Sequence, residues 1–208
     1  MTGRFITLEG GEGAGKSTQA KRLAATLKSR GIDVIVTREP GGSRGAEEIR
    51  KLLVEGAPGR WDAVTETLLL FAARADHIAR KIKPALAEGQ WVISDRFADS
   101  TYAYQGAGRG LDRETIRRIE AASTNAFKPE LTLVLDLPPE TGLARAGARN
   151  TSETRFENFD LAFHIKLREA FREIVQREPD RCAFIDATGT EDRVAELIWR
   201  AVAGKFKL

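Results

Sequence analysis

The stretch Gly10-Gly11-Glu12-Gly13-Ala14-Gly15-Lys16-Ser17 fits the pattern G-x-x-x-x-G-K-[ST] of a phosphate-binding loop. A β-rich run at residues 4–9 precedes it, and a helical pattern begins at Lys16. In such a loop, glycines let backbone N–H groups surround phosphate oxygens, and the helix N-terminus adds a positive dipole. Lys16 is placed to reach the outer phosphates and Ser17 to ligate Mg²⁺. A plain glycine-rich turn is the alternative, which the flanking strand and helix disfavour.

The composition is that of a single domain. The chain has 208 residues, 42% hydrophobic and 30% charged, which is enough for one substantial core and short for two. We therefore expect one domain over residues 1–208. Thirty-three basic and thirty acidic residues give a net charge of +3, without the basic blocks typical of nucleic-acid-binding tails. The surplus equally suits an enzyme with anionic substrates, so we expect no nucleic-acid partner.

The rare residue types exclude several other classes of protein. Cys182 is the lone cysteine and cannot form an intramolecular disulfide, and His77 and His164 are too few for a zinc cluster. Both histidines are interpreted as surface or packing residues. No apolar stretch approaches the roughly 18 residues of a transmembrane helix, so we expect no membrane span and a cytoplasmic protein.

Strand-like and helix-like segments alternate along the chain. Apolar, β-branched runs predict strands at residues 4–9, 33–37, 91–94, 131–137 and 182–186. Helical patterns follow Lys16 and cover residues 46–54, 63–87, 113–123, 139–148, 159–177 and 191–203. Near-continuous apolar strands separated by helices are typical of a parallel sheet covered on both faces. The sequence therefore predicts an α/β protein with a doubly wound, five-stranded parallel sheet.

Polar residues at strand ends are the first candidates for a site, because ligands of such folds bind at the carboxyl ends of strands. Asp95 ends the third strand and is the first choice for holding Mg²⁺, directly or through water. Asp136 has a similar position, although capping of the following turn explains it equally well. Arg96 is expected to hold a phosphate as a planar, permanently charged donor. A salt bridge to a neighbouring acid is its alternative.

A basic segment follows the fourth strand. Arg145, Arg149 and Arg155 lie within residues 145–155, a stretch rich in small and polar residues. We expect a short lid over residues 145–157, because phosphoryl transfer is catalysed by positioning and by cations placed against the migrating group. Gly13 adds to the argument, since the phosphate-binding loop has no arginine of its own. Taken alone, the segment is more typical of a solvated basic connection, but together with the upstream phosphate-binding loop and Asp95-Arg96 it favours a lid.

Longer motifs resemble the thymidylate kinase family in order and spacing. They are the phosphate-binding loop, Arg38-Glu39-Pro40-Gly41-Gly42, Phe71-Ala72-Ala73-Arg74, residues 95–106 and Arg155-Phe156-Glu157. The resemblance runs over residues 5–203. It implies a P-loop nucleoside monophosphate kinase fold and a homodimer. It also implies transfer of the γ-phosphoryl group of ATP to dTMP with Mg²⁺, giving dTDP and ADP for dTTP synthesis.

Carried over residue by residue, the resemblance implies roles in binding dTMP. Phe71 would stack on thymine and Arg74 would donate to a base carbonyl, and the two share one helix face. Tyr104 would pack against the deoxyribose, and Glu12 would lie near the 3′-hydroxyl or the metal. The remaining substrate-binding candidates are Ser100, Thr101 and Gln105 for the pyrimidine edge, and Arg38, Arg50 and Arg96 with Pro40 at the 5′-phosphate.

The same resemblance implies roles in catalysis and in ATP binding. Arg145 would lie over adenine, with Ala187 and Gly189 in part of its loop. The catalytic candidates are Glu12, Lys16, Asp95, Arg96, Arg149 and Arg155, and those for Mg²⁺ are Ser17 and Asp95. The candidates for binding ATP are Gly10, Gly11, Glu12, Gly13, Ala14, Gly15, Lys16, Ser17, Thr18, Arg145, Ala187 and Gly189.

Two positions depart from the pattern of the family. Phe97 stands where many relatives have tyrosine, and Gly147 stands where some bacterial members carry another lid arginine. The arginine that contacts the transferred group thus stays open between Arg149 and Arg155. Gly13 together with lid arginines is similar to the bacterial branch with its catalytic arginine in the lid.

Three other functions stay in view. Another nucleoside monophosphate or deoxynucleoside kinase would share the loop and the lid, but Arg74 and Gln105 favour dTMP. A GTPase-like switch lacks its Asn-Lys-x-Asp signature in this sequence. A DNA-dependent ATPase would need tight, salt-sensitive DNA binding. The sequence also leaves open whether the Glu39–Pro40 bond is cis or trans.

Overall fold

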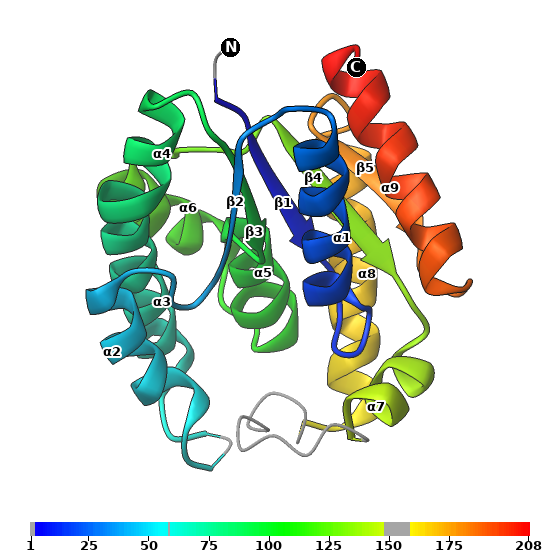
Figure 1. Ribbon diagram of the computed structural model, residues 1–208. Helices are drawn as coiled ribbons and strands as arrows, with labels where there is room; N and C mark the ends of the chain where they lie inside the picture. The colour runs from blue at the N-terminus through cyan, green and yellow to red at the C-terminus, as the bar shows by residue number, and fades with distance from the viewer. Residues whose placement is uncertain (1–2, 58, 148–158) are drawn as a thin grey trace.

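The computed structural model describes residues 3–57, 59–147 and 159–208, in which strands and helices alternate (Figure 1). In chain order the elements are β1 (Phe5–Glu9), α1 (Lys16–Ser29), β2 (Val34–Arg38), α2 (Arg44–Val54), α3 (Ala63–His77), the π-helix η1 (Ile78–Ile82), α4 (Lys83–Ala87), β3 (Trp91–Asp95), α5 (Ala98–Thr101), the π-helix η2 (Tyr102–Gly108), α6 (Arg113–Thr124), β4 (Leu131–Asp136), α7 (Pro139–Gly147), α8 (Leu161–Arg177), β5 (Cys182–Asp186) and α9 (Glu191–Phe206).

The strands of the described residues form one five-stranded parallel sheet in the order β2-β3-β1-β4-β5. This confirms the α/β class and the sheet that the sequence predicts. Central β1 pairs with β3 and β4, and the register places Leu8 of β1 and Arg38 of β2 opposite Asp95 of β3. Because the strands are parallel, their carboxyl ends meet at one edge of the sheet. The strand-end candidates are therefore brought together there.

Helices cover both faces of the sheet, as Figure 1 shows. On one face, α1 and α9 bury alternate residues of the strands, including Ile6, Leu8 and Ile93. On the other face, α8 and η2 pack on β4 and β5, while η1 and α4 pack on Phe5 and Val92. Two-sided burial explains why the strands read as continuous apolar runs.

The predicted helix over residues 63–87 is present but not uniform. It consists of α3, the π-helical turn η1 and α4. Pro84 lies in the first turn of α4. Its ring cannot donate a backbone hydrogen bond and clashes with the carbonyl four residues earlier, which explains the wider π-helical turn directly before it. None of the helices in the described parts of the chain is long and apolar enough to cross a bilayer.

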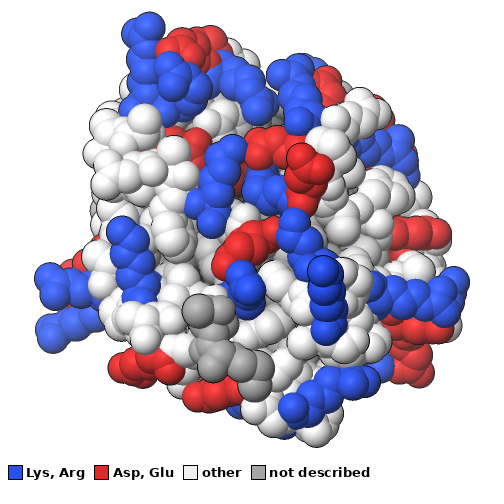
Figure 2. Space-filling view, turned by 90° about the horizontal axis from the view of Figure 1, so that it is seen from above, with Lys and Arg blue, Asp and Glu red and all other residues white. Residues whose placement is uncertain are grey.

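Charges of both signs share the face at the amino ends of the strands. In Figure 2, lysine and arginine side chains alternate there with aspartate and glutamate. One such pair joins Arg4 and Glu130 at 3.6 Å. The basic surplus of the sequence is thus interspersed with acids on this face.

Candidate active site

The phosphate-binding loop connects the carboxyl end of β1 to α1. Gly10, Gly13 and Gly15 have φ angles of 137°, 66° and 86°, which glycine adopts without strain. Gly15 is the N-cap of α1, so the loop meets the positive end of a helix. A Cβ on Gly13 would lie 2.0 Å from the carbonyl oxygen of Gly142 in α7. Position 13 therefore cannot carry an arginine unless α7 moves.

Lys16 points back across this loop. Its Nζ donates to the carbonyl oxygens of Gly10 at 3.2 Å and Gly11 at 2.7 Å. Burial, helped by the charge of Arg96, lowers the pKa of Lys16 to about 8, against the pull of nearby carboxylates. A phosphate oxygen is a stronger partner for an ammonium than a carbonyl, so the Lys16 side chain is suited to exchange these bonds for a nucleotide phosphate.

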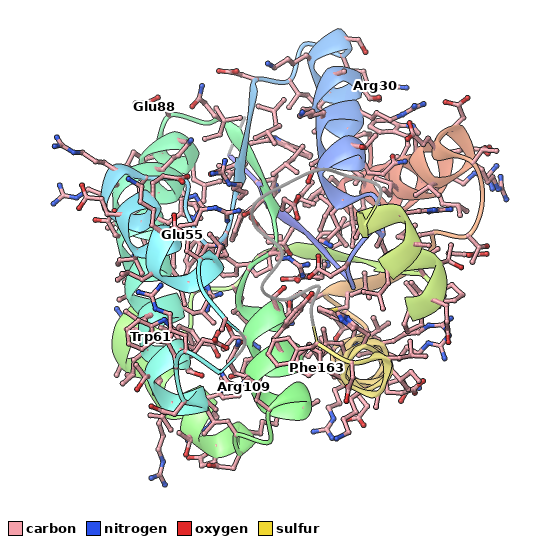
Figure 3. All side chains as sticks on the ribbon, turned by 90° about the horizontal axis from the view of Figure 1, so that it is seen from below. Arg30, Glu55, Trp61, Glu88, Arg109 and Phe163 are labelled. Atoms are coloured by element: carbon pink, nitrogen blue, oxygen red, sulfur yellow. The ribbon has the colours of Figure 1, made fainter. Side chains whose placement is uncertain are left out.

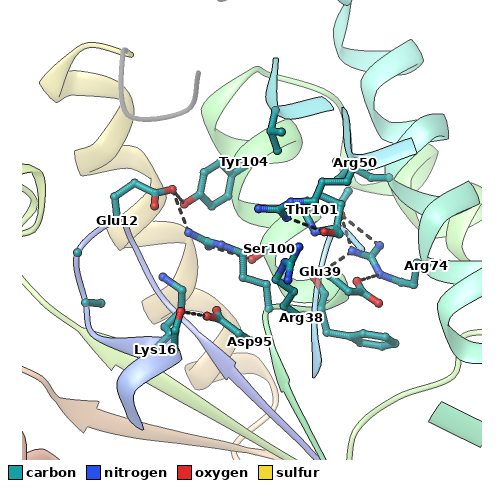
Figure 4. A pocket seen from close by; sticks show the side chains of 18 of the residues that line it. Glu12, Lys16, Arg38, Glu39, Arg50, Arg74, Asp95, Ser100, Thr101 and Tyr104 are labelled. Carbon is teal, nitrogen blue, oxygen red and sulfur yellow. Dashed lines mark hydrogen bonds and ion pairs between the residues drawn. The ribbon is translucent and has the colours of Figure 1, made fainter. Parts of the chain in front are cut away.

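Ser17 and Asp95 meet directly beside the loop. The Ser17 hydroxyl donates to Oδ2 of Asp95 (Figure 4). Mg²⁺ prefers hard oxygen ligands and is commonly held by one or two carboxylates, substrate phosphates and water. A hydroxyl and a carboxylate in contact next to a phosphate-binding loop fit this set of donors.

Arg96 lies between the loop and the helical segment that follows β3. Its guanidinium donates to the carbonyl oxygen of Gly10 at 3.0 Å, to Oγ of Ser100 at 3.2 Å and to Oε1 of Glu12 at 2.9 Å. It also lies 4.9 Å from the ring centroid of Tyr104. Burial opposes its charge, but Tyr104, Glu12 and other acids hold the pKa of Arg96 above its ordinary range.

Glu12 accepts a second hydrogen bond, from the Tyr104 hydroxyl at 2.6 Å. Burial alone would raise the pKa of Glu12, but the charges of Arg96 and Lys16 and this hydrogen bond lower it to about 2. Glu12 is therefore a fixed negative charge at the mouth of the loop. Figure 4 shows Glu12 and Tyr104 reaching toward each other across the cavity.

Glu9, the last residue of β1, holds the segment that follows Arg96. Its carboxyl group is fully buried and accepts hydrogen bonds from the backbone N–H of Phe97 at 2.7 Å and from Oγ of Ser100 at 2.6 Å. Burial and the nearby Asp99 raise the pKa of Glu9 to about 8. These two bonds fix the residues on the carboxyl side of Arg96.

Arg74 occupies the opposite end of the cavity. Its side chain is 2% exposed, and it donates to Oε2 of Glu39 at 2.7 Å, to Oγ1 of Thr101 at 3.2 Å and to the carbonyl oxygen of Phe97 at 3.1 Å. Glu39 in turn contacts Nδ1 of His77 at 3.0 Å. His77 is thus a buried residue rather than a surface one, and its other ring nitrogen bonds Thr37.

The position of Phe71 corrects the sequence interpretation. Its ring is 1% exposed and does not line the cavity; the guanidinium of Arg74 lies 4.6 Å from its centroid instead. Leu70 lines the cavity in its place. Neighbouring residues of a helix point about 100° apart, so a shift of one position exchanges a ring that faces the ligand for a ring in the core.

Two further arginines line the cavity near the end of β2. Arg50 donates to the carbonyl oxygen of Pro40 at 2.6 Å, and Arg38 donates to Glu47 at 3.0 Å. The Glu39–Pro40 bond is cis, which answers the question that the sequence left open. Figure 4 shows both guanidinium groups on the side of the cavity that faces Ser100 and Thr101.

Most of these groups line one cavity of about 290 Å³. The predicted site residues that line it are Glu12, Gly13, Ala14, Gly15, Lys16, Ser17, Thr18, Arg38, Pro40, Arg50, Arg74, Asp95, Arg96, Ser100, Thr101, Tyr104 and Gln105. Sequence reasoning assigned no role to four other lining residues, which are Glu39, Val54, Leu70 and Phe97. For Glu39 a signal was present, because it belongs to the Arg38–Gly42 motif.

Other candidates lie away from this cavity. Arg145 is exposed in the last turn of α7, and Ala187 and Gly189 lie in the loop between β5 and α9. Arg149 and Arg155 lie outside the described residues. Asp136, whose role the sequence left undecided, accepts hydrogen bonds from two arginines of α8, Arg168 and Arg172, at 2.7 to 3.2 Å.

A phosphate-binding loop at one end of a cavity and a buried guanidinium at the other leave room for a nucleotide acceptor between them. On a five-stranded parallel sheet of this order, the arrangement defines the class of P-loop nucleoside monophosphate kinases. Within that class the chain belongs to the thymidylate kinase family, because the family model described as thymidylate kinase matches residues 8–198. The protein is accordingly a kinase that phosphorylates dTMP to dTDP.

Individual relatives agree with this assignment over nearly the whole chain. Thymidylate kinase from Caulobacter vibrioides is 56% identical over 206 residues, which cover 99% of both chains. Thymidylate kinase from Jannaschia sp. is 55% identical over 202 residues and 97% of both chains. The crystal structure of thymidylate kinase from Ehrlichia chaffeensis superposes with a TM-score of 0.78 at 32% identity, covering 97% of this chain and 99% of that one.

Proposed function

We propose that this protein transfers the γ-phosphoryl group of ATP directly to the 5′-phosphate of dTMP, with Mg²⁺ held at Ser17 and Asp95, giving dTDP and ADP. The observation that carries the proposal is that the residues suited to bind ATP phosphates and those suited to bind the acceptor line the same cavity. Lys16, Ser17 and Asp95 line one end, and Arg74, Thr101 and Gln105 line the other. Arg96 lies between them, where the two phosphate groups would meet.

The residues of the cavity suggest how the transfer proceeds. An oxygen of the dTMP phosphate attacks the γ-phosphorus in line, and the bond from the γ-phosphorus to the oxygen that bridges to the β-phosphate breaks. Because the attacking phosphate is already an anion, no general base is needed. Lys16 and Arg96 stabilise the charge that spreads over the transferred group. Bound Mg²⁺ would neutralise charge on the β- and γ-phosphates.

The source of a further catalytic arginine is part of this proposal. Position 13 lacks the space for a side chain beside Gly142, so an arginine from the loop is disfavoured. We infer that Arg149 or Arg155 supplies the charge from a lid over residues 145–157, with Arg145 near adenine. Both lid arginines lie outside the described residues.

The base end of the cavity supports a pyrimidine acceptor. Arg74 and Gln105 offer polar groups on two sides of it, and Leu70 and Phe97 provide apolar walls. The apolar wall from Leu70 takes the place that the sequence interpretation gave to Phe71. Tyr104, tied to Glu12, would lie against the sugar.

An acceptor panel tests the proposal. The purified protein is assayed for ADP release from ATP and Mg²⁺ with dTMP, dUMP, dCMP, AMP, GMP or thymidine as acceptor. We expect the highest kcat/KM with dTMP, and formation of dTDP checked by chromatography. A clear preference for any other acceptor would contradict the proposal, and omission of Mg²⁺ should abolish turnover.

We further propose that residues 1–208 act as one domain, in a homodimer, in the cytoplasm. Val64 and Leu68 support the dimer, because they are 44% and 52% exposed one turn apart on α3 and offer apolar area to a second copy. Light scattering coupled to gel filtration tests this proposal. A monomeric mass at micromolar concentration would contradict it.

A further inference from the structure

The amide of Gln105 is held in one orientation by a buried carboxylate. Gln105, in η2, is 1% exposed and lines the cavity. Its Nε2 donates to Oε1 of Glu66 at 2.8 Å, and Glu66 is fully buried. No hydrogen-bond donor reaches Oε1 of Gln105 in the described structure. The amide nitrogen is therefore engaged within the protein, and the amide oxygen has no hydrogen-bond partner among the described residues.

Glu66 is itself paired with Arg109, which is in turn anchored to the backbone. Nη1 of Arg109 lies 2.9 Å from its Oε1, and Nη2 of Arg109 donates to the carbonyl oxygen of Trp61 at 2.7 Å. Figure 3 shows Arg109 and Trp61 on the same side of the molecule in this view. A carboxylate accepts hydrogen bonds and does not donate them, so Glu66 can face only the NH₂ side of the Gln105 amide.

The position of Glu66 on α3 places it in the base end of the site. Glu66, Leu70 and Arg74 are spaced four residues apart and form one row along the helix. Leu70 and Arg74 line the cavity, and Gln105 joins the row through Glu66. A flat base against Leu70 would thus have the Arg74 donor and the Gln105 acceptor along its edge.

We propose that Glu66 is a positioning residue that fixes the amide of Gln105 and thereby selects a base with an N–H in its edge. The inference rests on the proposed function, and it concerns the choice between bases. Thymine carries an N3–H donor, which pairs with Oε1 of Gln105. Cytosine carries an acceptor at N3, which would face the Gln105 oxygen and leave two acceptors opposed.

An unanchored glutamine would not discriminate in this way. Rotation of the amide by 180° exchanges its oxygen and nitrogen at almost no steric cost, so its hydrogen-bond partners alone decide the orientation. With glutamine at position 66, the partner can either accept or donate. The Gln105 amide can then turn its NH₂ toward the N3 acceptor of cytosine.

The test compares dTMP with dCMP in the wild type and in Glu66→Gln. We expect the ratio of kcat/KM for dTMP to that for dCMP to fall on the order of ten-fold in Glu66→Gln, which is the effect of one mismatched hydrogen bond. The change should appear in KM for dTMP and leave KM for ATP unaltered. The exchange variant Glu66→Gln with Gln105→Glu should restore the ratio, because the carboxylate then accepts from position 66 and offers its other oxygen to N3–H.

A matched control is Glu120→Gln, which neutralises another buried carboxyl group outside the cavity, where it accepts from the Tyr102 hydroxyl at 2.6 Å. Its dTMP/dCMP ratio should equal that of the wild type. An unchanged ratio in Glu66→Gln, or an equal loss with both nucleotides, overturns the inference. If Glu66→Gln does not fold, the test uses the double variant Glu66→Gln with Gln105→Glu. A folded double variant that has lost the preference for dTMP over dCMP overturns the inference.

The same experiment separates this inference from the proposed function. A wild type that fails to phosphorylate dTMP contradicts the proposed function. Calorimetric binding of dTMP and dCMP needs no turnover and still measures the effect of Glu66 on the choice of base. Equal affinity of the wild type for both nucleotides would contradict the role of Glu66 even if dTMP is phosphorylated.

Discussion

At the scale of single residues, Arg96 makes the salt bridge that the sequence offers as one alternative, and its side chain still lines the cavity where we propose that it binds phosphate. It has a φ of 70°, in the left-handed region that costs a side-chain-bearing residue roughly 1–2 kcal/mol. Hydrogen bonds to Glu12, Ser100 and the carbonyl oxygen of Gly10 hold it there. The salt bridge to Glu12 orients the guanidinium and leaves it lining the cavity. Strained residues of this kind persist where their surroundings determine them, commonly at functional sites.

Lys16→Ala tests the proposed role of Lys16 in phosphoryl transfer. Removal of its ammonium group takes away charge stabilisation of the transferred phosphoryl group, so kcat should fall on the order of 10² or more. Stopped assays of dTDP formation at saturating ATP and dTMP measure this loss.

Lys21→Ala is the matched control, because Lys21 is exposed on the same helix α1. It should retain the kcat of the wild type. A mild effect of Lys16→Ala on kcat, with a large rise only in KM for ATP, would show that Lys16 binds ATP without stabilising the transition state.

At the scale of elements, α3 shows what a pattern can and cannot predict. The helix and Arg74 follow from the sequence, because the period of apolar residues and the Phe71–Arg74 motif are visible there. The residue that faces the cavity does not follow, since residues 68–71 are all large and apolar. Only the packing of α3 against α2 and α6 settles that Leu70 lines the cavity and Phe71 lies in the core.

Arg74→Ala tests the contact between α3 and the segment after β2. The Arg74 and Glu39 side chains are 2% and 3% exposed. Loss of the guanidinium would leave the Glu39 charge buried without this partner, which typically costs about 3–5 kcal/mol of unfolding free energy. KM for dTMP should rise more than KM for ATP. Urea denaturation followed by circular dichroism and steady-state kinetics measure the two effects.

Arg38→Ala provides the comparison for stability. Its ion pair with Glu47 lies on the same segment but is 52% and 39% exposed, so its removal should cost under about 1 kcal/mol. Similar losses of stability in the two variants would show that burial of the Arg74–Glu39 pair is not what matters. Equal changes of both KM values in Arg74→Ala would place Arg74 outside the base pocket.

The sequence pattern predicts no helix directly after β3. Residues 98–108 form α5 and η2, yet the sequence indicated only a motif there. The stretch contains serine, threonine and glycine, which have modest helix propensity. It is helical because Ala103 and Tyr104 pack on α8 and because Glu9 accepts bonds from Phe97 and Ser100. Such tertiary contacts override the local helix propensity and cannot be predicted from the spacing of apolar residues.

At the scale of the whole molecule, polar side chains from three distant segments, which are α5, β4 and the residue before β5, contact one another. Arg181 donates to both carboxylate oxygens of Asp99 at 2.8 and 2.9 Å and to Oγ1 of Thr132 at 2.7 Å. Asp99 contributes to the raised pKa of Glu9. The sequence predicts the strands that carry these residues, but long-range pairs between positions 9, 99 and 181 depend on the tertiary fold.

Glu9 therefore couples the stability of the molecule to pH. Its pKa is raised from 4.5 to about 8 in the folded protein. Below pH 4.5 both states are protonated. Between that value and about 8 the unfolded chain releases a proton that the folded protein keeps, so wild-type stability falls as pH rises, by on the order of 1 kcal/mol per pH unit. Glu9→Gln is neutral at every pH and should lack this loss.

Urea denaturation at several pH values between 4.5 and 9 measures the difference in unfolding free energy between Glu9→Gln and the wild type. This difference should grow in favour of Glu9→Gln as the pH rises to about 8. Above that value it should stay constant, since Glu9 is then ionised in both the folded and the unfolded wild type. Glu114→Gln is the control, because Arg117 and Arg118 lower the pKa of this exposed group to about 2 and place its own pH dependence below the window. Parallel curves for Glu9→Gln and the wild type would mean that Glu9 is ionised beneath Arg96 at neutral pH. The segment around Phe97 and Ser100 would then be held by a charged carboxylate.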